Sequence, residues 1–597
     1  MLSSKNNKRT LTQHLVAVTF VFLLSLVLFP VWFTQNRSSV DPWIYWGVGD
    51  NPKLSYLNNF GDLYYLERYI LILPQIISHK LFGPFFSQMA TALFWILLST
   101  YFASKISRLF VSSKLTILIM LLAFSSQGLL ISYGSNLHHA PTMTLTLCLT
   151  YLLLKRDQIL SSKESKINLL FIGITYAAIT NNYASIAVFL FIPIVITLLF
   201  EYRKMRDNEQ SIDHGTSLRL NSVITHNIPI LTTTFALTSA LFEIVHQVLS
   251  DASAPILIQQ LRLGSSLLTE KNPWGGGGFT SYWTAGLWVF SSMPWVLLSI
   301  VILAVNSLIH RGGSLNARVQ IISIGILVSM ALTTLGYSSP TWHTFTACIL
   351  FPIYFLSVTV AIKFLMNFCT ESNLVILLTI FLLGKILFQF FWINTTLNSL
   401  DSFKSLIRFS LLASGVLVIC LCSLVIKKTF FKMHFIFAKI TLGVALFSIV
   451  FASLPHSLLQ LYTGEKPAFT SYNQANSFYV NLSHMRDSIL SETKSGSVSY
   501  RVWLTPDDEI ALASTQLYAY SLISFTPGIA DCNQVNWATP GNNTKIMSFS
   551  SNNFTRQGFN RYLEKCGAKV SQFRLINKGN SPDSSKAPYA VAIILPK

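Results

Sequence analysis

Asp41 is an acidic residue set among aromatic side chains, a few residues after an apolar stretch, 11–33, that is long enough to cross a bilayer. It opens the run Asp41-Pro42-Trp43-Ile44-Tyr45-Trp46-Gly47. A carboxylate at the boundary between water and lipid can accept a proton from a hydroxyl group. The alternative is structural, with Asp41 capping a surface helix that Pro42 begins and the aromatic residues forming an interfacial belt. The residues alone leave both interpretations open.

A second pair of ionisable residues lies inside a later apolar stretch, 227–249. Glu243 and His246 are three positions apart, so on a helix they share a face. Ionisable groups at membrane depth are costly, and they usually face a cavity or each other. The pair therefore either lines an active cavity or satisfies itself and fixes helix packing.

The elements that must position these residues are membrane spans. Hydrophobic residues make up 51% of the chain and charged residues 11%, and the mean hydropathy is +0.50, whereas a soluble protein is about one quarter charged. We therefore predict an all-α polytopic domain of about 13 transmembrane helices over residues 1–455. The expected spans are approximately 11–33, 85–104, 115–134, 140–154, 167–180, 184–200, 227–249, 284–308, 319–337, 343–365, 373–392, 406–426 and 436–455.

The distribution of basic residues predicts the orientation of these spans. The chain has 43 Lys and Arg against 24 Asp and Glu, and the basic residues gather in alternate short loops, which indicates topology rather than a nucleic-acid partner. Basic residues also precede the first span, which lacks a cleavage site. We expect a multi-pass protein of the bacterial inner (plasma) membrane, with a cytoplasmic N-terminus and a periplasmic C-terminal domain. The basic loops are 105–114, 155–166, 203–206, 311–318 and 427–432.

Two of the long outward-facing segments have recognisable structure. The first outer loop, 34–84, contains an amphipathic element at 69–81, expected to rest its apolar side on the membrane. The tail, 456–597, is polar and predicts a small α/β domain. Its expected strands are 500–504, 545–549 and 590–595, and its expected helices are 478–492, 507–522 and 555–566. Cys532 and Cys566 lie in this tail and could form a disulfide in an oxidising compartment.

The order of these elements resembles that of the GT-C superfamily of membrane glycosyltransferases. That superfamily includes protein O-mannosyltransferases, aminoarabinose transferases and bacterial lipid-linked sugar transferases. The run at 41–47 and the run Tyr64-Tyr65-Leu66-Glu67-Arg68 are similar to first-loop motifs of a bacterial branch, and a surface helix ending in Leu81-Phe82-Gly83 follows them. The architectural resemblance covers the whole chain, and the part specific in sequence covers about residues 10–155.

The resemblance implies transfer of a sugar from a polyprenyl-phosphate donor to an extracytoplasmic acceptor, such as a cell-envelope glycan, a lipid or a protein. It implies an inverting displacement in which Asp41 is the general base. A phosphate leaving group needs cations, for which Arg68, Arg262 and Lys271 are the outward-facing candidates. The candidates for lining the cavity are Tyr45, Asp50, Glu67, Glu243 and His246.

The chain departs from the family pattern between the third and fourth spans. Many relatives carry a second acidic residue there, whereas this chain has His138 and His139. Adjacent histidines could hydrogen-bond a phosphate, hold a metal ion or serve as ordinary interface residues. Neither a two-acid mechanism nor a metal requirement therefore carries over from the resemblance, and the sequence indicates no certain cofactor.

Other functions would suit parts of the pattern. A glycan polymerase or ligase would share the lipid-linked substrate but would depend more on arginines in a later outer loop. A transporter with an outer ligand-binding domain would also bury ionisable groups, but its two halves would carry broken helices in corresponding positions. A sensor that uses the tail to bind a ligand is the non-enzyme alternative.

Overall fold

The computed structural model describes seven long segments of the chain and five strands. The described residues are 68–124, 139–156, 162–209, 227–250, 317–326, 343–366 and 370–380, the strand residues 499–504, 524–525, 544–550, 568–576 and 589–596, and the isolated residues 19, 45, 48, 49, 255, 256, 258, 302, 303, 328, 382 and 383.

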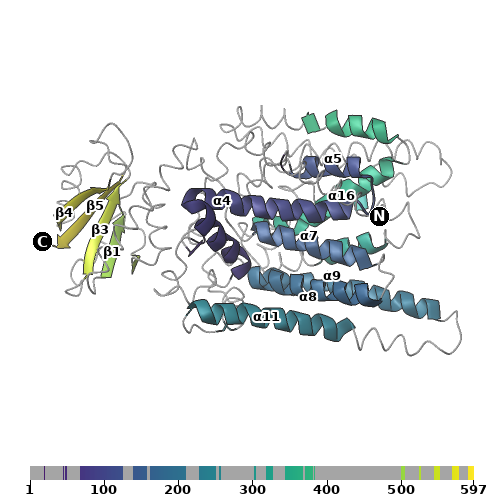
Figure 1. Cartoon of the computed structure of the whole chain (residues 1–597), viewed down its shortest axis with the longest axis horizontal. Helices are drawn as coiled ribbons and strands as arrows, with labels where there is room; N and C mark the ends of the chain where they lie inside the picture. Colours follow the sequence, from purple (N-terminus) through teal and green to yellow (C-terminus); the bar gives the residue numbers. More distant parts are fainter. Residues whose placement is uncertain are drawn as a thin grey trace, which may run out of the picture.

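Helices make up the larger part of the described chain, as the hydropathy predicts. Helix α7 packs against α4, α8 and α16, and α8 packs in turn against α9 and α11 (Figure 1). The bounds are α4 Tyr69–Ser107, α5 Ser113–Phe124, α7 His139–Lys155, α8 Ser162–Asn182, α9 Ala184–Glu209, α11 Ile228–Ser250 and α16 His343–Leu365. Two further apolar helices are Ala317–Ile326 and Glu371–Ile380. The total of about thirteen spans stays a prediction.

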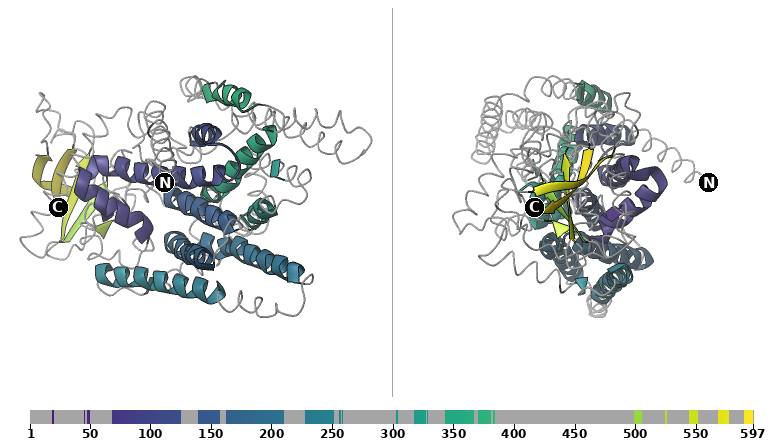
Figure 2. Two further views of the ribbon diagram at one scale, coloured as in Figure 1. Left: turned by 45° about the vertical axis from the view of Figure 1, so that its right-hand side comes forward. Right: turned by 90° about the vertical axis from the view of Figure 1, so that its left-hand side faces the viewer.

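Helix α4 is two helices joined at a kink. Gly83 has φ 74° and ψ 174°, a backbone conformation that side chains other than glycine rarely adopt, and Figure 2 shows the two segments at an angle. The first segment matches the predicted surface element, but Leu71 is 1% exposed and packs inside the protein. The exposed apolar side chains of this segment are Ile77, Leu81 and Phe82. The start of the segment is therefore buried in protein, and only its end presents an apolar surface.

Close helix contacts occur where glycine removes a side chain. A Cβ on Gly325 would lie 2.7 Å from Cα of Pro193 in α9, and a Cβ on Gly173 in α8 would lie 2.9 Å from Cβ of Thr234 in α11. Small residues at such crossings are typical of helices that associate in lipid.

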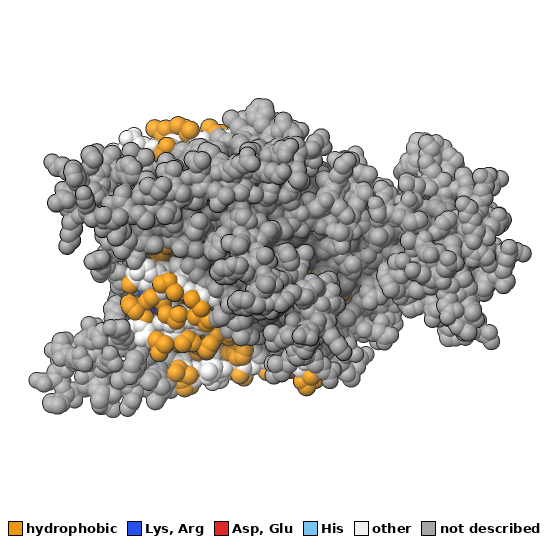
Figure 3. Space-filling view, turned by 180° about the vertical axis from the view of Figure 1, so that it is seen from behind, with side chains coloured by type: hydrophobic (Ala, Val, Ile, Leu, Met, Phe, Trp, Pro, Cys, Tyr) orange, Lys and Arg blue, Asp and Glu red, His pale blue; other side chains and the backbone are white. Residues whose placement is uncertain are grey.

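The outward faces of the helices are apolar. Val248 on α11 is 74% exposed, and Leu237, Leu241 and Ile244 on the same helix are also exposed. The described part of the face in Figure 3 shows hydrophobic side chains and no charged ones. Segments Phe86–Ser107 and Ile228–Val248 are long and apolar enough to cross a bilayer. Exposed apolar faces of this extent indicate helices in contact with lipid.

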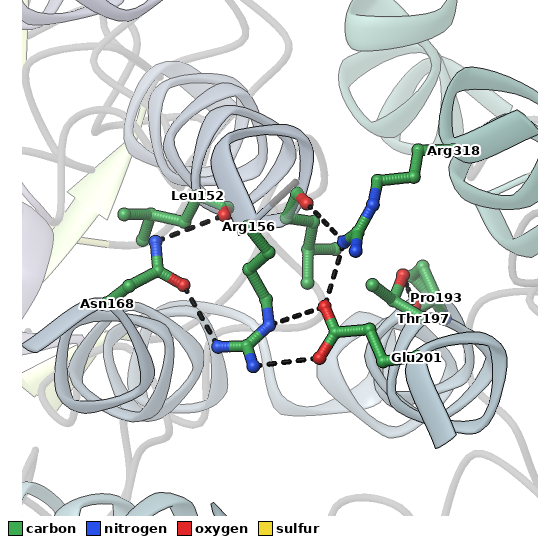
Figure 4. Close-up of polar contacts among 8 residues, drawn as sticks. Leu152, Arg156, Asn168, Pro193, Thr197, Glu201 and Arg318 are labelled. Atoms are coloured by element: carbon green, nitrogen blue, oxygen red, sulfur yellow. Dashed lines mark hydrogen bonds and ion pairs between the residues drawn. The ribbon is translucent and has the colours of Figure 1, made fainter. Parts of the chain in front are cut away.

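One end of the bundle is held together by a single carboxylate. Glu201 of α9 accepts two hydrogen bonds from Arg156, at 2.7 and 2.8 Å, and one from Arg318, at 2.8 Å (Figure 4). Arg156 also donates to Asn168 of α8 at 3.3 Å. We call this the Glu201 end, and the opposite end the Arg68 end. Arg156 and Arg318 come from two loops that the charge pattern assigns to one side, and the structure brings them together.

The tail contains a five-stranded mixed sheet with strand order β2-β1-β3-β5-β4. Strands β1 Ser499–Leu504, β3 Thr544–Ser550 and β5 Tyr589–Pro596 lie where the sequence predicts strands, whereas β2 Ser524–Phe525 and β4 Ala568–Ile576 were not predicted. β1 pairs in parallel with both β2 and β3, and β5 is antiparallel to β3 and β4. The helices predicted for this domain lie outside the described residues, so its α/β class stays a prediction.

Candidate functional site

Arg68 lies immediately before α4, at the Arg68 end, and is 8% exposed. Its Nη1 donates a hydrogen bond to the hydroxyl of Tyr45 from the first outer loop. Its Cζ lies 5.7 Å from the ring centroid of Tyr45 and 5.8 Å from that of Tyr183, in the turn between α8 and α9. Two aromatic rings therefore flank the guanidinium group, an arrangement that favours the cation and limits its movement.

The first residues of α4 are held by two other helices. The hydroxyl of Tyr69 lies 2.6 Å from Nδ1 of His246 on α11, and the two rings meet edge to face with centroids 5.9 Å apart. The amide of Ile70, which has no partner within its own helix, donates to Oδ1 of Asn181 at 3.4 Å. The backbone that carries Arg68 is thus fixed by α8 and α11.

His139 is fully buried at the start of α7, just before the predicted span 140–154. Burial, and to a smaller extent the positive charge of nearby Arg68, hold the pKa of His139 well below its usual value. The imidazole is therefore neutral at pH 7 and can both donate and accept a hydrogen bond. About one turn further along α7, Oγ1 of Thr142 accepts a hydrogen bond from Nδ2 of Asn182 at 2.8 Å, which connects α8 to α7.

His79 lies further along the first segment of α4, facing Gly49. A Cβ on Gly49 would lie 3.1 Å from Cδ2 of His79 and 3.1 Å from Cβ of Gln75, so Gly49 packs closely against this segment. Burial lowers the pKa of His79 from 6.5 to about 3. His79 is therefore neutral over the physiological range, and its protonation would oppose this packing.

We expect the protein to lose thermal stability as the pH falls below about 6.5, in part because of His79. Below that pH the unfolded chain binds a proton on this residue, whereas the folded chain binds it only near pH 3. The His79→Gln variant should lose less stability, by up to about 1.4 kcal/mol for each pH unit below 6.5. Unfolding temperatures of both proteins at pH 7.5, 6.5 and 5.5 measure this difference, and parallel curves would contradict the assignment.

The structure gathers four of the residues singled out in the sequence. Tyr45, Arg68, His139 and His246 all lie at the Arg68 end, where α4, α7 and α9 begin and α8 and α11 end. Glu243 lies one helical turn before His246, but the two have separate partners. Glu243 accepts from Nε2 of Gln247 at 2.8 Å and from the amide of Ile256 at 2.9 Å, whereas His246 contacts Tyr69.

Eight of the predicted residues lie outside the described part of the chain. They are Asp41, Asp50, Glu67, His138, Arg262, Lys271, Cys532 and Cys566. Among the described residues, no group of three or more His, Cys, Asp or Glu side chains is arranged to hold a metal ion.

Sequence reasoning missed the polar residues at the end of α8 and in the turn to α9. Asn181, Asn182 and Tyr183 interrupt two apolar runs, and each contacts a different part of the site. Such a polar and aromatic interruption at the end of two spans is a readable signal. Tyr69 begins the amphipathic element predicted at 69–81, but its contact with α11 was not predicted.

No family model matches this sequence, and no curated protein matches it. Two solved structures are similar to the chain, both of ArnT from Cupriavidus metallidurans. The structure of ArnT bound to undecaprenyl phosphate is 10% identical, with a TM-score of 0.47, over 96% of this chain and 97% of that chain. The structure of ArnT in the apo state is 12% identical, with a TM-score of 0.41, over 97% of this chain and 98% of that chain.

Proposed function

We propose that this protein is a membrane glycosyltransferase that moves a sugar from a polyprenyl-phosphate donor to an extracytoplasmic acceptor. The first-loop motifs support this proposal, because they resemble those of the GT-C superfamily and include Arg68 and Tyr45. The observation that carries it is the setting of Arg68, a buried guanidinium held between two aromatic rings at one end of an apolar helix bundle.

That setting suits a lipid phosphate. A guanidinium group presents paired donors that match phosphate oxygens, and its fixed position means that little freedom is lost on binding. The neutral imidazole of His139 can add a hydrogen bond without repelling the cation. The exposed apolar surface toward the end of the first α4 segment, at Ile77, Leu81 and Phe82, offers a long lipid chain a place to lie, roughly 13–21 Å along the helix from Arg68.

We expect Arg68→Ala to weaken binding of undecaprenyl phosphate by about 1.5–3 kcal/mol, the loss typical of a hydrogen bond to a charged group. Arg68→Lys should recover part of the affinity, because Lys keeps the charge but loses the planar pair of donors. Equilibrium binding to purified protein in nanodiscs measures both effects. Arg108→Ala serves as the control, since Arg108 is an exposed arginine at the opposite end of α4. Equal affinity of Arg68→Ala and Arg108→Ala would reduce Arg68 to a packing residue.

Activity itself is tested with radiolabelled polyprenyl-phosphate sugars from a lipid extract, supplied to the purified protein with envelope fractions as acceptor. Transfer of label to a glycan, lipid or protein supports the proposal and identifies the acceptor class. Movement of label across the membrane without transfer would favour the transporter, and extension of an existing lipid-linked chain would favour the polymerase.

A further inference from the structure

The first segment of α4, residues 69–82, can rotate about the kink at Gly83, and we call this segment the lever. The helix is continuous from Tyr69 to the kink at Gly83, where the positive φ breaks it from the span that follows. At 1.5 Å per residue this segment is roughly 20 Å long, so a rotation of about 5° at Gly83 would move its start by about 2 Å. A displacement of 1 Å is enough to disrupt a catalytic arrangement. The position of Arg68 therefore depends on how firmly the start of the lever, at Tyr69, is held by its neighbours.

Side chains from α8 and α11 hold that end. Asn181 accepts from the backbone of Ile70 at 3.4 Å, a long hydrogen bond. The contact between Tyr69 and His246 is much shorter, at 2.6 Å, it is buried, and it connects residues 177 positions apart. His246 is fully buried and Tyr69 likewise. The contact between Tyr69 and His246 is thus stronger than the hydrogen bond between Ile70 and Asn181.

We propose that Tyr69 and His246 are positioning residues for donor binding, acting through Arg68. The inference rests on the proposed function and adds residues that do not touch the donor themselves. Tyr69 is bonded directly to Arg68 along the chain, so a hydrogen bond that fixes the Tyr69 ring also fixes the backbone from which the guanidinium projects. Nδ1 of His246 accepts a hydrogen bond from the Tyr69 hydroxyl in one tautomer and donates a hydrogen bond to the hydroxyl oxygen in the other.

Substitutions at His246 separate the hydrogen bond from the packing. His246→Leu removes the hydrogen bond between this residue and Tyr69, whereas His246→Asn places a polar atom close to the position of Nδ1 and should keep the contact. Tyr69→Phe removes only the hydroxyl. We expect His246→Leu and Tyr69→Phe each to weaken undecaprenyl phosphate binding roughly three- to tenfold, as for loss of one buried hydrogen bond, and His246→Asn to bind almost as wild type.

A double-mutant cycle tests whether the effect passes through Arg68. In the Arg68→Ala background, His246→Leu should cause no further loss of donor affinity, because nothing remains to be positioned. Hydrogen exchange gives a readout independent of activity, and backbone amides of residues 70–77 should exchange faster in His246→Leu and Tyr69→Phe than in wild type. Val248→Ala, at an exposed position on the same helix, is the matched control and should change neither quantity.

The outcomes distinguish the two proposals. If wild type binds donor and His246→Leu binds it equally well, the positioning role is wrong and the proposed function stands. Additive losses in the double variant, or unchanged exchange at 70–77, would likewise overturn the positioning role. If wild-type protein neither binds undecaprenyl phosphate nor transfers sugar, the proposed function itself fails, and the positioning role fails with it.

Discussion

Glu201→Gln should destabilise the folded protein by about 3–5 kcal/mol, the cost typical of removing one partner from a buried ion pair. The side chains of Arg156 and Arg318 are 5% and 4% exposed, and both donate to the Glu201 carboxylate. Glutamine is neutral and offers one acceptor oxygen in place of two, so two buried guanidinium groups would lose the charge that balances them. Thermal unfolding of the purified protein in one detergent measures the loss.

A matched control distinguishes burial from the mere loss of a carboxylate. Glu371 accepts one hydrogen bond from Ser112 at 2.7 Å in an exposed setting, so Glu371→Gln should cost less than about 1 kcal/mol. Replacing Arg156, Glu201 and Arg318 together by Met, Leu and Met should recover most of the stability, because no buried charge then remains. Equal losses in Glu201→Gln and Glu371→Gln would show that the network contributes little.

The helices could be predicted from the sequence because lipid imposes a simple rule. A span needs a long apolar run, and the runs at 140–154 and 343–365 match α7 and α16 within a residue or so at each end. Helix α8 was predicted at 167–180 but extends over Ser162–Asn182. Its first turns carry Lys163, Glu164 and Lys166, which hydropathy assigns to a loop although these residues are compatible with a helix.

The site could be predicted only in part, because its contacts join residues far apart in the chain. Arg68 stood out as a cation in the first outer loop, His139 as a departure from the family pattern and His246 as an ionisable residue in an apolar stretch, and the structure places all three at one end. The sequence pattern could not predict which residues contact one another. Helical spacing suggested that His246 pairs with Glu243, whereas His246 contacts Tyr69, which comes from another helix. Spacing along one helix identifies neighbours on a face, but the packing between helices decides which of them meet.

Asp41→Asn should lower the rate of sugar transfer by on the order of 10²-fold or more, the loss typical of removing a general base. Asparagine keeps the shape and the hydrogen-bonding capacity of aspartate but cannot take a proton from the acceptor hydroxyl. Asp41 stands four residues before Tyr45, at most about 14 Å along an extended chain, and Tyr45 contacts Arg68, the proposed phosphate ligand. On this proposal, the first-loop motif supplies both the base, Asp41, and the residue that contacts the proposed phosphate ligand, Tyr45.

The substitution also separates catalysis from folding. A helix cap contributes about 1 kcal/mol, and asparagine caps as well as aspartate, so Asp41→Asn should unfold at the wild-type temperature and bind undecaprenyl phosphate with wild-type affinity. Turnover is then compared at saturating donor, with Glu371→Gln as the control at an exposed carboxylate of the Glu201 end. Normal turnover in Asp41→Asn would leave Asp41 a helix cap and direct the search for the base to Glu243 or to the other aspartates of the first outer loop, Asp50 and Asp62. Of these three, Glu243 is the one that lies on α11, one helical turn from His246, which contacts Tyr69 at the start of α4.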